Sequence, residues 1–262
     1  MDITLDERGT DGPLVLVLHG GGGPATVAPF VAHLADTHHV IAPTHPGWNG
    51  TDRPDDLDTV RALAGVYLDL LEQRDARNAV LVGNSLGGWI ALEMAVQAAE
   101  RGSDAVGALV VVDAVGVTVP DEPVRDFFAL DARGVAEYAW HDPERGYLDP
   151  ATLSDERRRV QAANMVALRT YAGGAAMADP TLASRLADVR VPALVLWGDS
   201  DRIVTPAYGA ALADALPDAR FVVVEAAGHL PQLERADATF AAVDAFVTAL
   251  PTPGADEAHD MR

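Results

Sequence analysis

Ser85 is the first residue whose type and setting could carry chemistry, and it lies in the run LVGNSLGG. The apolar stretch 79–82 before it predicts a buried strand, and the alanine-rich stretch 86–100 after it predicts a helix. Gly83 and Gly87, two positions to either side, suit a tight strand-to-helix turn that holds the serine in a strained conformation. The hydroxyl would then stand at a helix N-terminus, where developing negative charge is favoured. The alternative at this point is a turn that needs small residues for structural reasons alone.

A serine hydroxyl is a weak nucleophile without a base, and eight histidines are available for that role. His229, in the run AGHLP, directly follows the last predicted strand, and Gly228 frees the backbone to aim the imidazole. His19 ends a strand beside glycines and is predicted to be a structural hydrogen-bonding residue. His45 and His141 could line a pocket, and the other four are predicted to be solvated. His229 is therefore the predicted base.

The base needs a third group to orient it, and the run LWGDSDRIV offers two carboxylates at a strand end. Asp201 lies three residues past Gly198, where the loop has turned, whereas Asp199 follows the glycine at once and suits a turn-capping role. Asp113 ends the preceding strand and could also reach an imidazole. Asp201 is the predicted acid, with Asp113 and Asp199 as alternatives.

An attacked carbonyl also needs two N–H donors for its developing oxyanion. The amide of Leu86, next after the serine, is one candidate. The other is expected in the glycine loop HGGGG, where Gly21 stands two residues past His19, with Gly22 as the alternative. Glycines suit a loop whose amide must point at a substrate with no side chain in the way.

The elements that must position these residues alternate between strands and helices. Apolar runs predict strands, and helical periodicity predicts helices at about 24–36, from a cap at Asp58, at 86–100 and at 236–250. The predicted strands are 2–5, 14–18, 40–42, 79–82, 108–112, 191–197 and 220–224. This order predicts an α/β fold, with a mostly parallel central sheet, helices on both faces, and sites outside the carboxyl ends of the strands.

The segment 118–188 differs from the rest, because it has no strand-like run and is rich in aromatic residues. It is predicted to be an inserted helical cap. The core is then expected in two parts, 1–117 and 189–250, and 251–262 is predicted to be a flexible tail. A chain of 262 residues can bury one such core with an excursion.

Composition excludes several classes of function. The chain has no cysteine, which removes thiolate chemistry, and no lysine, which removes Schiff-base chemistry and a P-loop. A net charge of −20 disfavours nucleic acid as a partner. No secretory signal or membrane-spanning run is evident, so a cytoplasmic location without membrane association is expected. We expect a small-molecule substrate, no cofactor and no metal.

One rival motif is a dinucleotide fingerprint. The spacing of Gly20, Gly22 and Ala25 fits weakly, but that interpretation needs an acidic residue at the next strand end, where the chain has the run APTH. Nucleotide binding is therefore disfavoured.

The chain resembles the α/β-hydrolase superfamily from about residue 10 to 250, both in the order Ser85, Asp201, His229 and in several short runs. The runs that carry this resemblance are HGGGG, PGWNGTD, GNSLGG, WGDSDRIV and GHLPQLE. The resemblance implies the α/β-hydrolase fold, a Ser-His-Asp triad and a helical cap at 118–188. It is strongest to the branch of carboxylesterases, lactonases and meta-cleavage-product (carbon–carbon bond) hydrolases.

Single positions separate the members of that branch. Asn84 and the glycine-rich loop look like the carbon–carbon bond hydrolases, but Leu230 stands where those enzymes often have tryptophan. No arginine of the predicted cap can be matched with the one that holds a carboxylate there; the candidates are Arg157, Arg158, Arg159 and Arg169. The serine nucleophile departs from haloalkane dehalogenases and epoxide hydrolases, which use aspartate.

The sequence thus predicts a serine hydrolase of a small, largely apolar ester or lactone. A carbon–carbon bond hydrolase is the alternative, and a non-catalytic small-molecule receptor on the same fold is an alternative of another class. Glycines, aromatic residues and neighbours of the serine are the candidate substrate contacts: Gly22, Trp48, Asn84, Trp89, Phe127, Phe128, Tyr138, Trp140 and Met165.

Overall fold

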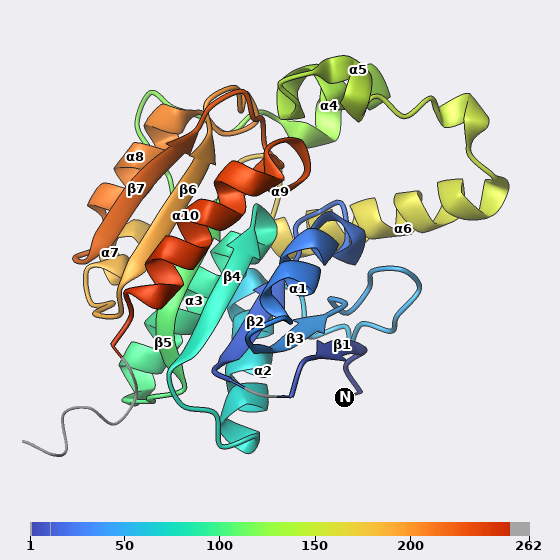
Figure 1. The fold of residues 1–262 in the computed structure, drawn as a ribbon. Coiled ribbons are helices and arrows are strands. Elements are labelled where there is room, and N and C mark those ends of the chain that lie inside the picture. Colours follow the sequence, from blue (N-terminus) through green and yellow to red (C-terminus); the bar gives the residue numbers. More distant parts are fainter. Residues whose placement is uncertain (1, 11, 252–262) are drawn as a thin grey trace, which may run out of the picture.

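The computed structural model describes residues 2–10 and 12–251, and a seven-stranded sheet runs through its centre (Figure 1). The strand order is β1-β3-β2-β4-β5-β6-β7; β1 is antiparallel to β3, and all other pairs are parallel. The bounds are β1 (Leu5–Arg8), β2 (Leu14–Leu18), β3 (His39–Pro43), β4 (Ala79–Asn84), β5 (Val106–Val112), β6 (Ala193–Gly198) and β7 (Ala219–Val224). The predicted α/β architecture is confirmed, although the first strand lies at 5–8 rather than 2–5.

Helices cover both faces of the sheet, which explains why its central strands are continuous apolar runs. In β2, Val15 and Val17 pack into the core beneath α1 (Ala28–Leu34) and α10 (Ala236–Thr248). Leu16 and Leu18 point the other way, toward α2 (Val60–Gln73), α3 (Leu86–Arg101) and α8 (Pro206–Asp214). The sheet is therefore buried on both sides, and the carboxyl ends of its parallel strands are the place where polar groups can gather.

The start of α2 differs from the prediction by one residue. The capping side chain is Thr59, whose hydroxyl accepts a hydrogen bond from the N–H of Ala62 at 3.1 Å. Asp58 lies one position too early to cap this helix. Both residue types favour this position, so the choice between them depended on the exact register of the first turn.

A helical segment separates β5 from β6. It contains the turns η2 (Phe127–Ala129) and η3 (Pro150–Thr152) and the helices α4 (Ala132–Ala139), α5 (Pro143–Gly146), α6 (Asp155–Ala172) and α7 (Leu182–Leu186). Figure 1 shows α4, α5 and α6 beyond the carboxyl ends of the strands, whereas α7 returns to pack against α3. A β-bridge between Gly116 and Ala178 joins the two ends of the excursion.

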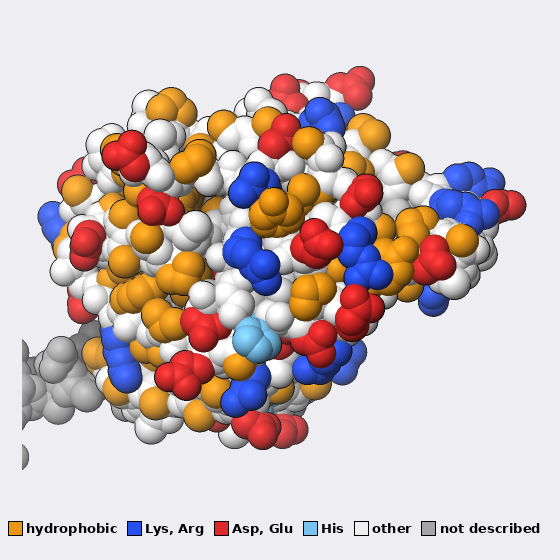
Figure 2. All heavy atoms as spheres, turned by 90° about the horizontal axis from the view of Figure 1, so that it is seen from above, with side chains coloured by type: hydrophobic (Ala, Val, Ile, Leu, Met, Phe, Trp, Pro, Cys, Tyr) orange, Lys and Arg blue, Asp and Glu red, His pale blue; other side chains and the backbone are white. Residues whose placement is uncertain are grey.

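Seen from above, this side of the molecule carries arginine and acidic side chains interspersed with apolar ones (Figure 2). Leu148, Met165 and Val166 are exposed large hydrophobic residues of the helical segment. Within residues 2–10 and 12–251, none of the helices combines the length and the apolar character needed to cross a bilayer. The predicted tail lies, apart from Pro251, outside the described residues.

Candidate active site

Ser85 stands at the turn between β4 and α3 in a backbone conformation that L-residues rarely adopt, with φ 57° and ψ −119°. Its N–H donates to the carbonyl of Val112 in β5 at 2.9 Å, and its own carbonyl accepts the N–H of Trp89 at 3.2 Å. These two bonds hold the strained residue from both sides. Strain of this kind persists only where the surroundings fix it, and it is characteristic of functional turns.

Two close backbone approaches explain the glycines of this turn. A Cβ on Gly83 would lie 2.2 Å from the carbonyl oxygen of Gly87, and a Cβ on Gly87 would lie 2.1 Å from the carbonyl oxygen of Leu18 in β2. Neither neighbour is a flexible side chain. The turn can therefore form only with hydrogen atoms at both positions.

His229 follows β7, and Asp201 follows β6, which is the adjacent strand. The imidazole Nδ1 lies 2.7 Å from Oδ2 of Asp201, and this is its only ring hydrogen bond among the described residues. The other carboxylate oxygen accepts the N–H groups of Ile203 at 2.8 Å and Val204 at 3.3 Å. Asp201 is thus held in place by backbone amides and orients the imidazole through Nδ1. Asp199, the alternative acid, instead accepts the hydroxyl of Ser200 at 2.7 Å.

The backbone of His229 is fixed independently of its ring. Its N–H donates to the carbonyl of Ala139 in α4 at 2.8 Å, and its carbonyl accepts Nδ2 of Asn84 at 3.1 Å. The N–H of Gly228 donates to Oε2 of Glu234 at 2.7 Å. The helical segment, the nucleophile turn and α9 (Pro231–Glu234) thereby all hold one loop.

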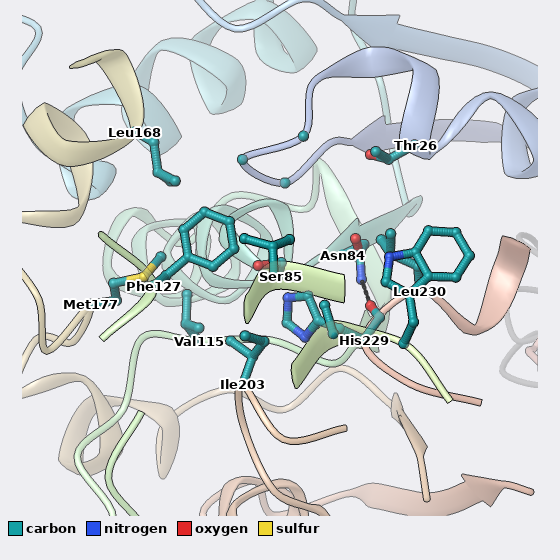
Figure 3. Close-up of a pocket in the computed structure, with 16 residues that line it drawn as sticks. Thr26, Asn84, Ser85, Val115, Phe127, Leu168, Met177, Ile203, His229 and Leu230 are labelled. Atoms are coloured by element: carbon teal, nitrogen blue, oxygen red, sulfur yellow. Dashed lines mark hydrogen bonds between the residues drawn. The ribbon is translucent and has the colours of Figure 1, made fainter. Parts of the chain in front are cut away.

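Ser85 and His229 line the same cavity of about 110 Å³, and Figure 3 shows the imidazole beside the serine side chain. The strand ends supply the polar groups of the cavity, and the helical segment supplies most of its apolar wall. Its lining residues are Gly20, Gly21, Gly22, Thr26, Asn84, Ser85, Val115, Phe127, Val135, Ala139, Trp140, Leu168, Met177, Ile203, His229 and Leu230.

The glycine loop presents amide groups to this cavity because its carbonyls are held on the opposite side. The carbonyl of Gly20 accepts Nδ1 of His19 at 2.7 Å, and that of Gly21 accepts Nε1 of Trp48 at 3.1 Å. In a trans peptide the C=O and the following N–H point in opposite directions. The amides of Gly21 and Gly22 are therefore directed away from the His19 and Trp48 rings, and both glycines line the cavity.

A buried pair of histidines supports the loop from below. Nε2 of His19 accepts the N–H of His45 at 3.0 Å, and Nε2 of His45 donates to the carbonyl of His19 at 2.9 Å. The hydroxyl of Tyr67 lies 2.7 Å from Nδ1 of His45, the ring nitrogen that remains as an acceptor. Each ring thus carries one proton and is neutral. Burial lowers the pKa of His19 to about 4, and burial together with the neighbouring His19 lowers the pKa of His45 well below its usual value.

Four of the predicted substrate contacts line the cavity, namely Gly22, Asn84, Phe127 and Trp140. Asn84 also has a structural role, because its Nδ2 bridges the carbonyls of His229 and Val112.

The other predicted contacts lie elsewhere, each for a physical reason. Trp48 is fully buried beneath the glycine loop, and Trp89 packs in the core against Gly116. The rings of Phe128 and Tyr138 are covered by the guanidinium groups of Arg169 and Arg125, at 4.3 and 4.4 Å. Met165 is exposed on α6 and does not line the cavity.

Sequence reasoning missed most of the apolar wall. Leu168 and Met177 come from the helical segment, and Val115 and Ile203 follow strand ends. Val115 and Ile203 could have been predicted from the sequence, since both lie within three residues of a candidate site carboxylate. Leu168 has the same helical spacing as any core leucine, so no signal distinguished it.

Asp113, Asp201 and His229 each place one potential ligand atom within 4.8 Å of the others. This cluster fits a metal poorly, because the Asp201 oxygens and the imidazole Nδ1 are already hydrogen-bonded to one another or to backbone amides. Burial and the neighbouring charge of Asp201 raise the pKa of Asp113 well above its usual value.

Residues 14–243 match the model of the alpha/beta hydrolase family. The chain belongs to this family. It is 29% identical over 259 residues to a 2-hydroxy-6-oxo-6-phenylhexa-2,4-dienoate hydrolase of Burkholderia cepacia, covering 90% of this chain and 87% of that protein. It is 31% identical over 241 residues to a pimeloyl-[acyl-carrier protein] methyl ester esterase of Aromatoleum aromaticum, covering 84% of this chain and 92% of that protein.

The fold of this alpha/beta hydrolase also matches solved structures. One is the 2-hydroxy-6-oxo-6-phenylhexa-2,4-dienoate hydrolase from Rhodococcus sp. strain RHA1, with a TM-score of 0.71, 23% identity, and coverage of 95% of this chain and 100% of that one. The predicted family and branch are confirmed, and the protein is a hydrolase.

Replacing Trp48 with phenylalanine should lower kcat of this hydrolase about 10-fold with little change in KM, because the Gly21 carbonyl loses the N–H that orients the loop. Steady-state kinetics of the variant measure both constants. Trp89→Phe is the matched control, since the indole N–H of Trp89 is buried without a partner among the described residues. Equal losses of kcat in both variants would contradict the orienting role.

Acid should destabilise this hydrolase through His19. Its pKa is about 4 in the folded state, against about 6.5 unfolded, so stability is present above pH 6.5 and declines as the pH falls toward 4. The linked loss for this buried group is about 3 kcal/mol. Urea unfolding at pH 7 and pH 4.5 should show a smaller decline in His19→Asn than in the wild type. His38→Asn should leave the decline unchanged, because this half-buried ring bonds only the hydroxyl of the neighbouring Thr37 among the described residues.

Proposed function

We propose that Ser85, His229 and Asp201 form the catalytic triad of a serine hydrolase that cleaves a small, uncharged ester or lactone. The observation that carries this proposal is the convergence of three strand ends on one cavity. There Ser85 and His229 line one cavity, and Nδ1 of the imidazole lies 2.7 Å from Asp201 (Figure 3). The order of the three residues in the chain is the one typical of this fold.

In the proposed reaction, Oγ of Ser85 attacks the substrate carbonyl carbon while its proton moves to Nε2 of His229. The oxyanion accepts hydrogen bonds from the amides of Gly21 and Leu86; the latter is the first residue of α3, so its N–H has no partner within the helix. The imidazolium then protonates the leaving oxygen, which departs as an alcohol. Water, deprotonated by the same imidazole, cleaves the acyl-enzyme and releases the acid and free Ser85.

The electrostatic character of the cavity favours an uncharged substrate. Of the residues that line it, His229 is the one with a titratable side chain, and the lining contains no arginine. Arg169 and Arg125, on the helical segment, lie instead over the aromatic rings of Phe128 and Tyr138. A substrate carboxylate would therefore be buried without a partner, which costs several kcal/mol. We propose that the segment 118–188, through α4 to α6, acts as the cap over this cavity.

A carbon–carbon bond hydrolase is the second candidate. The similarity to proteins named 2-hydroxy-6-oxo-6-phenylhexa-2,4-dienoate hydrolase favours it, as does Asn84 beside the serine. Such a substrate is a dienoate and carries a carboxylate, so the uncharged lining argues for the ester or lactone instead.

A matched substrate panel tests the choice. The panel comprises a short-chain methyl ester, the same chain ending in a carboxylate, a lactone and a ring-fission dienoate. We expect kcat/KM for the neutral ester to exceed that of its anionic counterpart by about 100-fold. Hydrolysis of the dienoate alone would replace the proposal with the second candidate. Absence of turnover with every acyl substrate would favour a non-catalytic receptor.

A further inference from the structure

Asp113 is a buried carboxyl group that the proposed mechanism does not use. It directly follows β5, has a positive φ of 45° and is completely buried. Its Oδ1 accepts the N–H of Gly198 at 2.9 Å, whereas Oδ2 is buried without a hydrogen-bond partner among the described residues. An unpartnered buried oxygen of this kind calls for an explanation.

The groups that face Asp113 explain its unpartnered oxygen. Asp201 and His229 each have an atom within 4.8 Å of a carboxyl oxygen of Asp113, and Glu234 is a further acidic neighbour. Asp201 accepts two backbone N–H groups and faces the imidazole Nδ1, whereas Asp113 accepts one backbone N–H. Where two buried carboxyl groups lie this close together, ionisation of one strongly disfavours ionisation of the other. The proton therefore belongs on Asp113, which has fewer donors to stabilise an anion.

We infer that Asp113 is a protonated positioning residue that donates a hydrogen bond from Oδ2 to Asp201. It also has a reserve role, meaning that it can orient His229 in place of Asp201. The inference rests on the proposed function. The proton gives the orphaned oxygen a hydrogen bond and holds the Asp201 carboxylate in place. When the charge of Asp201 is removed, the repulsion that most directly opposes ionisation of Asp113 is lost, and its carboxylate can then orient His229. Burial and the neighbouring Asp201 charge, which raise the pKa of Asp113, agree with this assignment.

A double-mutant cycle measures the reserve role. The substitution at 201 should be alanine, because an asparagine amide would direct its NH₂ at Nδ1 of His229 and impose the wrong tautomer. We expect Asp201→Ala to lower kcat/KM about 100-fold, rather than the roughly 10⁴-fold loss of an unsupported triad. Adding Asp113→Asn should cost a further factor of about 100, whereas Asp113→Asn alone should cost about 3-fold, because the amide can keep both hydrogen bonds.

The pH profile separates this role from a structural one. In Asp201→Ala, kcat/KM should rise with pH as Asp113 ionises, and this added dependence should disappear in the double variant. If Asp113→Asn costs the same factor in both backgrounds, the reserve role is wrong, because a merely structural residue behaves additively.

An infrared measurement tests the protonation state without relying on catalysis. At pH 7 the wild type should show the C=O stretch of a protonated carboxylic acid, which should be absent in Asp113→Asn. If this band is present but Ser85 hydrolyses no substrate, the proposed function fails while the protonation of Asp113 stands. If Ser85-dependent hydrolysis occurs without the band, the inference about Asp113 fails alone.

Discussion

Replacing Ser85 with alanine is expected to lower kcat/KM for a neutral ester by about 10⁵-fold, because the attacking oxygen is lost while the oxyanion amides remain. The methyl group of alanine fits in place of the Ser85 side chain, so the cavity should still bind substrate. Initial rates on the most active substrate of the panel give the effect. Ser184→Ala is the matched control, since that hydroxyl is exposed and bonds the carbonyl of Thr181 in the α7 region.

His229→Ala should cause a loss of similar size, because Ser85 then has no base to accept its proton. The two losses should not multiply, because the serine and the imidazole act as one unit in proton transfer. A double variant with the activity of either single variant is therefore expected. Unchanged turnover in His229→Ala would assign the base to another group, and unchanged turnover in Ser85→Ala would move the chemistry away from this turn.

The polar members of the candidate site could be proposed from the sequence because they are tied to strand ends. In a parallel sheet the carboxyl ends meet at one edge, so Ser85, Asp201 and His229 could be placed near one another from their positions after apolar runs alone. In the structure Ser85 and His229, which follow β4 and β7, line the same cavity, and Asp201, which follows β6, contacts the imidazole of His229 from behind the cavity wall. The fold could also be predicted, because the strands of a sheet that is covered by helices on both faces have continuous apolar sequences.

The apolar wall of the cavity could not be predicted in the same way. An aromatic residue has the same sequence pattern whether it faces a ligand or packs in the interior. Trp48 and Phe127 illustrate this: the indole of Trp48 is buried against the carbonyl of Gly21, whereas the ring of Phe127 faces the cavity. The difference depends on the direction in which the loop and the helical segment leave the core, which no local periodicity encodes.

Replacing Gly87 with alanine is expected to have the largest effect on stability. The new Cβ would lie 2.1 Å from the carbonyl oxygen of Leu18 and 2.5 Å from its carbon, both backbone atoms of a central strand. The helix α3 and β2 must therefore separate. We expect a loss of about 3 kcal/mol in the free energy of unfolding, or a fall of about 10 °C in Tm. Because β2 leads directly into the glycine loop, kcat should fall together with stability.

A glycine-to-alanine change in another helix gives the matched control. Gly65 lies within α2, and its new Cβ would meet only the ends of long side chains, 3.1 Å from Oε1 of Gln97 and 3.7 Å from Nη2 of Arg101. Because these side chains can move, the higher helix propensity of alanine decides the sign of the stability change. Gly65→Ala should therefore raise the free energy of unfolding by up to about 1 kcal/mol. The same substitution thus has opposite effects at the two sites, because a flexible side chain can move aside and a strand carbonyl cannot. Equal stability of the two variants in urea unfolding would show that the nucleophile turn relaxes without disturbing β2.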